Sequence, residues 1–129
     1  MIFDWIGNLP VIVPNWDKRL PALYNDLNAK WFNKSSPPLS GEFLCEFCDM
    51  PRESAGIFID ADRAKAISTA DVEVRPGIRI NSRLHHLSDH VKIAMLHELV
   101  HAAGIIGHGE AFHAEIARLI LSGAYEGLL

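Results

Sequence analysis

Four histidines and two glutamates lie within seventeen residues, in the segment HELVHAAGIIGHGEAFH that runs from His97 to His113. Residues four apart in an α-helix stand on one face, one turn from each other, so His97 and His101 can direct two imidazoles at one metal ion. Glu98 lies about 100° round the helix from His97 and can reach a water on that metal without binding the metal itself. The HExxH spacing therefore predicts a zinc site in which Glu98 is the catalytic general base.

A catalytic zinc usually takes three protein ligands, so a third ligand must come from outside the HExxH pair. His108 is the favoured residue, because Gly104 and Gly107 let the chain turn sharply after His101 and bring the next residues back over the metal. The metzincin pattern HExxHxxGxxH does not apply, because its third histidine would fall at Gly107. The spacing leaves open a site without a third ligand, and three other candidates for that ligand: Glu110, His113 and Glu115.

A last helix is predicted from about Gly109 to Leu121, with an apolar stripe formed by Phe112, Ile116, Leu119 and Ile120. On a helical wheel that begins at His108, this histidine shares the face of Phe112 and Leu119, which must meet the HExxH helix. His113 lies about 140° away on the same wheel and is expected to face solvent.

The other elements follow from apolar periodicity and turn residues. Apolar positions at spacings of three and four predict an amphipathic helix in NWDKRLPALYNDLNAKWF, with a buried face made by Leu20, Tyr24, Leu27 and Trp31. Three runs, EFLCEF, AGIFIDA and GIRINSRL, have the composition of short strands. Ser88 can cap the HExxH helix, and Gly104 ends it. The expected fold class is α+β: an N-terminal helix, a small three-stranded sheet, the HExxH active-site helix and a C-terminal helix.

Length and composition predict one domain over residues 1–129, with residues 1–14 as an N-terminal arm and a core over about 15–122. The formal charge is −4, and no run of Lys or Arg exceeds two residues, so the chain lacks the basic footprint of a dedicated nucleic-acid binder. No apolar stretch approaches the roughly 20 residues that span a bilayer. These features predict a protein that has no membrane partner.

Two cysteines, Cys45 and Cys48, form a single CxxC, which is too few for a disulfide framework. The N-terminal segment has no basic lead and is interrupted by prolines, so it does not have the pattern of a signal peptide. We therefore expect a cytoplasmic location and ordinary thiols. Three further histidines precede the HExxH helix and are interpreted as surface residues: His85, His86 and His90.

The combination of HELVHAAG, then HGEAF and a helix resembles the SprT-like zinc metallopeptidase domain, the family of the Spartan protease. LPALYNDLNAKWF is similar to that family's first helix, AGIF to its glycine-led central strand, and IRINSRL to the strand before the active-site helix. The resemblance covers about residues 20–122. It implies a minigluzincin-like α+β fold, one catalytic zinc per chain, and His108 as the third zinc ligand.

The resemblance also implies a zinc metalloendopeptidase that hydrolyses peptide bonds in a protein or peptide substrate. Spartan-type relatives cleave proteins crosslinked to DNA, but this chain is mildly acidic and has neither a C-terminal zinc ribbon nor a DNA-binding appendage in its sequence. DNA is therefore weakly supported as a partner. The alternative function is a non-catalytic, zinc-stabilised protein-interaction module.

Overall fold

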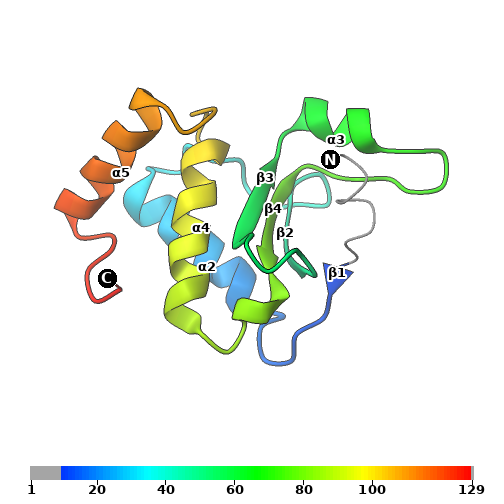
Figure 1. Cartoon of the computed structure of the whole chain (residues 1–129), viewed down its shortest axis with the longest axis horizontal. Helices are drawn as coiled ribbons and strands as arrows, with labels where there is room; N and C mark the ends of the chain where they lie inside the picture. Colours follow the sequence, from blue (N-terminus) through cyan, green and yellow to red (C-terminus); the bar gives the residue numbers. More distant parts are fainter. Residues whose placement is uncertain (1–9, 129) are drawn as a thin grey trace.

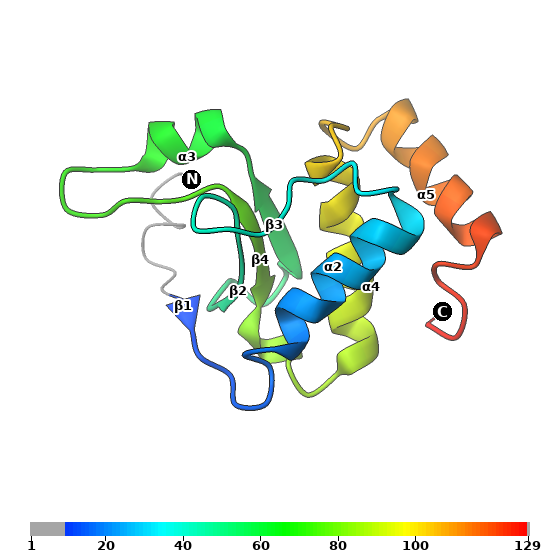
Figure 2. The same cartoon turned by 180° about the vertical axis from the view of Figure 1, so that it is seen from behind.

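In the computed structural model of the chain, which describes residues 10–128, the fold consists of four α-helices and a small four-stranded sheet (Figures 1 and 2). The strands are β1 (Pro10–Val11), β2 (Leu44–Cys48), β3 (Gly56–Ile59) and β4 (Gly77–Asn81). The helices are α2 (Arg19–Trp31), α3 (Ala61–Ile67), α4 (Ser88–Ala102) and α5 (Glu110–Ser122), with a 3-10 turn, η1, at Ser82–Leu84. The predicted α+β class is confirmed.

The strand order is β1-β2-β4-β3, with β2 parallel to β4 and the other neighbours antiparallel. The three predicted strands are present, but the prediction of a three-stranded sheet was wrong, because Pro10–Val11 adds a fourth strand beside β2. Two residues are too few to show the alternation by which a strand is recognised. This strand belongs to the predicted arm of residues 1–14, of which residues 1–9 lie outside the described part of the chain.

The main core lies between the sheet and the helices α2 and α4. The predicted face of α2 is buried at Leu20, Tyr24 and Leu27, and Trp31 is half-buried. The α4 side chains and the sheet side chains that complete this core are Val91, Met95, Leu99, Phe47, Ile78 and Ile80. Because α4 contacts both β3 and β4, burial of its apolar face fixes the HExxH segment beside the edge strand β3.

Helix α3 was missed by the sequence analysis, which extended the second predicted strand, AGIFIDA, to Ala61. The strand ends at Ile59, and Asp60 caps α3 by accepting a hydrogen bond from the Arg63 backbone N–H at 2.7 Å. Ala64 and Ile67 then bury the helix against Ile59 in a second, smaller apolar cluster. A helix of seven residues gives too few turns for a clear period, so the Asp cap was its only local signal.

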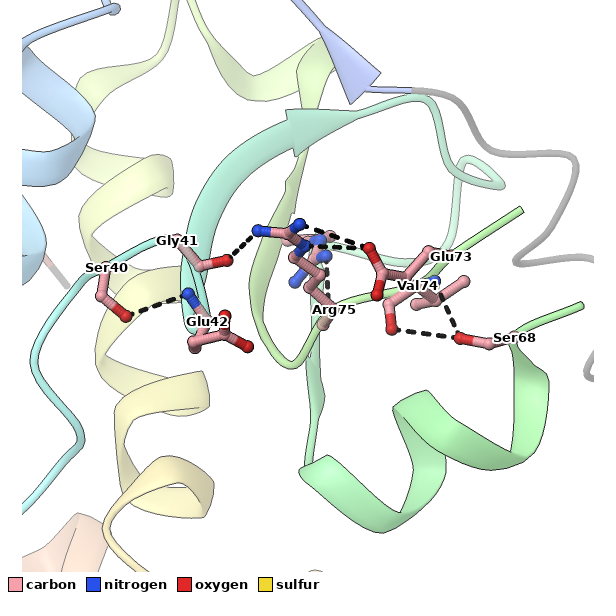
Figure 3. Close-up of polar contacts among 8 residues, drawn as sticks. Ser40, Gly41, Glu42, Ser68, Glu73, Val74 and Arg75 are labelled. Carbon is pink, nitrogen blue, oxygen red and sulfur yellow. Dashed lines mark hydrogen bonds and ion pairs between the residues drawn. The ribbon is translucent and has the colours of Figure 1, made fainter. Parts of the chain in front are cut away.

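Polar contacts hold the segment after α3, residues 68–75, in place (Figure 3). The Ser68 hydroxyl donates to the Ala64 carbonyl at 2.7 Å and accepts from the Val74 backbone N–H at 2.9 Å. The Arg75 guanidinium pairs with Glu73 and donates to the carbonyl of Gly41, which precedes β2. These contacts hold α3 at the end of the sheet.

The helix ends differ in part from the predictions. Ser88 is the first residue of α4 and does not cap it; the cap position is Leu87, and no side chain bonds there. In α5, Phe112 and Leu119 are buried as predicted, whereas Ile120 is 48% exposed. Within residues 10–128, no helix is both long enough and apolar enough to cross a membrane.

Candidate metal centre

The last two turns of α4 carry His97 and His101, whose ring centroids lie 5.2 Å apart. Both side chains are half-buried and line a cavity of about 300 Å³. The core residues of α4 hold the opposite face of the helix against the sheet, so the i, i+4 pair is directed into the cavity. The predicted pairing of these two histidines on one helix face is present.

His108 reaches the same point from the loop between α4 and α5. Its Nε2 lies 3.1 Å from Nε2 of His97 and 3.2 Å from Nε2 of His101. The loop turns at Gly104 (φ +114°) and Gly107 (φ +76°), conformations that favour glycine. The predicted helical-wheel position of His108 was wrong, because this residue lies two positions before α5 begins.

The other third-ligand candidates lie elsewhere. Among the described residues, the structure brings only His97, His101 and His108 together as a potential metal-binding group, with one nitrogen from each within 4.8 Å of the others. Glu115 instead pairs with Arg118 at 2.6 Å. The other two candidates, Glu110 and His113, are exposed and lie outside this group.

The donor atoms fit a metal ion. Nδ1 of His101 lies 2.8 Å from the Ile105 carbonyl, which can only accept, so Nδ1 carries the proton and Nε2 of a neutral ring has a free lone pair. Two nitrogens on a tetrahedral zinc at about 2.05 Å would be roughly 3.3 Å apart. The observed separations of 3.1 and 3.2 Å are close to this value.

Burial and the neighbouring His101 and His108 lower the pKa of His97 to about 4. The His97 imidazole is therefore neutral at physiological pH, which is the form that binds metals. Phe112 packs against all three imidazoles, with ring centroids 4.8 Å from His97, 5.1 Å from His101 and 4.8 Å from His108. The Phe112 ring thus forms an apolar contact surface for the three imidazoles, a role that the sequence analysis did not assign.

Glu98 is 6% exposed and lines the same cavity. Burial raises the pKa of its carboxyl to about 7, and a hydrogen bond from the Phe58 backbone N–H of β3 opposes part of this shift. Gly56, also on β3, leaves room for this arrangement: a Cβ there would lie 3.3 Å from Glu98 Cγ and 2.9 Å from the Arg79 carbonyl oxygen. A carboxyl with a pKa near neutrality is suited to accept and return a proton.

The cavity has walls from distant parts of the chain: β3, Asp60 and Arg63 at the start of α3, the α4 histidines, and the loop residues 105–108. Arg63 was not identified from the sequence, because α3 was not predicted. The three upstream histidines are exposed, as expected, and do not line this cavity: His85, His86 and His90.

Cys45 and Cys48 are free thiols. Residues three apart on a strand point to opposite faces, so these two cannot act as a pair. Burial is the main cause that raises the pKa of each thiol to about 12, which is the behaviour of unreactive cysteines.

We compared the chain with models of known protein families, with curated proteins and with solved structures, and none of them matches it.

Proposed function

We propose that this protein is a zinc-dependent metalloendopeptidase with a SprT-like, minigluzincin-like fold. His97, His101 and His108 hold one zinc per chain, and Glu98 is the general base. One observation carries the proposal: three imidazole nitrogens converge beside a buried carboxyl, in a cavity that borders an edge strand.

Zinc supplies a Lewis acid that lowers the pKa of water and polarises a carbonyl. Glu98 takes the proton of the attacking water and delivers it to the leaving amine, a task for which its raised pKa is suited. The Phe58 N–H orients the Glu98 carboxylate toward the cavity. Phe112 and the Ile105 carbonyl hold the imidazoles in place.

The edge strand β3 supports an extended peptide as the substrate. It pairs with β4 on one side, and Gly56, Ile57 and Phe58 line the cavity. An extended peptide can add to such an edge through main-chain hydrogen bonds, which bind without regard to sequence. Arg63 is the only Lys or Arg among the described residues that line the cavity, so we propose a protein or peptide as the direct ligand and leave DNA without a binding role there.

Burial of Glu98 favours the enzyme over the zinc-stabilised module. A carboxyl that is 6% exposed and forms no ion pair with any residue of 10–128 costs folding free energy. A non-catalytic module that binds zinc for stability has no need of this buried carboxyl, whereas the proposed catalysis requires it as the general base.

The test begins with zinc content per chain in protein purified without a metal-affinity tag. We expect one zinc in the parent and in the control His113→Ala, and loss of zinc in His108→Ala. Glu98→Gln is expected to keep its zinc and to lose hydrolysis of unfolded proteins by at least about 1,000-fold. A parent that takes up no zinc would refute the proposal, as would full activity in Glu98→Gln.

A further inference from the structure

Apart from its histidines, the cavity is lined by one basic side chain, Arg63. Arg63 is exposed, and no ion pair involves it among the described residues. Asp60 lines the cavity too, but its carboxylate already accepts the Arg63 backbone N–H at 2.7 Å. The Arg63 guanidinium is thus available to a ligand in the cavity.

The backbone of Arg63 is held in place on the protein. Asp60 caps the first turn of α3, and Ala64 and Ile67 bury the helix against Ile59. The polar contacts of the following segment anchor its other end (Figure 3). The side chain therefore extends from a fixed backbone, and only its own rotamers are ordered when it pairs with a ligand.

Part of the cavity wall is apolar. Ile105, Ile106 and Gly107 line it, and Ile106 is 89% exposed. Figure 1 shows α3 and the loop between α4 and α5 at the same end of the molecule, on either side of the C-terminal end of α4. The cavity lining therefore combines a cation from α3 with apolar side chains from the loop between α4 and α5.

We propose that the cleft selects peptide segments that carry a carboxylate, which pairs with Arg63, next to an apolar side chain that packs on Ile105 and Ile106. This inference rests on the peptidase proposed above. A guanidinium binds a carboxylate through two parallel hydrogen bonds, a geometry that the other groups of the cavity do not offer. The carboxylate comes from an Asp or Glu side chain or from the free C-terminus of the substrate.

The experiment measures peptide binding by fluorescence anisotropy at low salt, on the zinc-loaded full chain with Glu98→Gln to prevent cleavage. Three sets of labelled apolar heptapeptides are compared: neutral with an amidated C-terminus, the same with one Glu moved along the sequence, and neutral with a free C-terminal carboxylate. The variants are Arg63→Gln and Arg63→Glu. Lys65→Glu is the matched control, because Lys65 is exposed on the same helix and does not line this cavity.

We expect one carboxylate-bearing set to bind about fivefold to tenfold more tightly than the neutral set. Arg63→Gln removes the preference, Arg63→Glu reverses it, and Lys65→Glu retains it. Preference for one position of Glu identifies an acidic side chain as the source; preference for the free C-terminus identifies a substrate end.

Equal binding of the three sets to the parent would overturn the proposal, as would a preference that survives in Arg63→Glu or no measurable binding of any peptide. Because binding is measured without turnover, these outcomes are separate from failure of the peptidase. An Arg63-dependent preference in a protein that does not hydrolyse peptides would leave this inference standing and refute the proposed chemistry.

Discussion

The two walls of the cleft are built in different ways. One wall consists of α4 and the loop before α5, and its three histidines lie within twelve residues of the chain, from His97 to His108. The other wall consists of β3 and the start of α3, about 40 residues upstream, and supplies a backbone N–H, a glycine and Arg63.

Under the proposed function, the difference separates two requirements of a metallopeptidase. The histidine wall determines whether a metal is held, because its ligands are set by helix geometry and by a tight turn. The strand wall determines whether that metal is useful, because β3 positions the Glu98 carboxyl and borders the space for a substrate. A substitution in the strand wall should therefore reduce hydrolysis and leave zinc binding unchanged.

Gly56→Ala is expected to give the largest difference between the two walls, with loss of hydrolysis and retention of zinc. The added Cβ would lie 2.9 Å from the Arg79 carbonyl oxygen and 3.3 Å from Glu98 Cγ, so β3 or Glu98 must shift. We expect hydrolysis to fall by about 100-fold, since misplacement of a catalytic group by about 1 Å has effects of this size. Zinc content should remain one per chain.

Gly41→Ala is the control, because a Cβ there meets its nearest atom at 3.5 Å, an ordinary contact. Peptide hydrolysis and zinc content are measured on both variants. Loss of zinc from Gly56→Ala would show that the two walls are not separable.

A second prediction concerns the stability of the metal-free protein. Because the folded-state pKa of Glu98 is raised to about 7 from an ordinary 4.5, folding favours the protonated carboxyl. The stability that this group contributes is complete below pH 4.5 and is lost as the pH rises through 7. Glu98→Gln should therefore unfold with a free energy about 3 kcal/mol higher than the parent at pH 8, and with little difference near pH 4.

Urea unfolding at the two pH values measures this effect, with Glu53→Gln at an exposed position as the control. An equal gain for Glu98→Gln at both pH values would show that the benefit comes from something other than ionisation of a buried carboxyl.

The smallest effect is expected from Phe112→Leu, at a residue of α5 that packs against the histidine wall. The substitution removes part of the ring that packs against all three imidazoles, so each can rotate away from its metal-binding orientation. Zinc affinity should weaken by about tenfold, as is typical when groups that orient metal ligands are lost. Competition with a chelator measures it.

Phe32→Leu is the matched control, because Phe32 is 5% exposed and Phe112 is 7% exposed. Both variants should lose about 1 kcal/mol of stability from the smaller side chain, but only Phe112→Leu should lose zinc affinity. An equal loss in the two variants would assign the effect to general destabilisation.

Prediction from the sequence succeeded where the signal was local and long enough. Helix α2 and the buried face that it presents follow from a period that extends over three turns. The strand β1 and helix α3 were missed because neither is long enough to show a period. Arg63 was missed with α3, since a charged residue in an unassigned segment has no predictable position.

The chain's own sequence determined the pairing of His97 with His101, because residues four apart in a helix are neighbours whatever the rest of the protein does. It also favoured the return of His108, because Gly104 and Gly107 permit left-handed turns. Only the tertiary structure decided that Glu98 is buried against Phe58 and Gly56 and that Arg63 shares its cavity. Those contacts join residues about 40 positions apart, and the pairing of strands and the packing of α4 on the sheet bring them together.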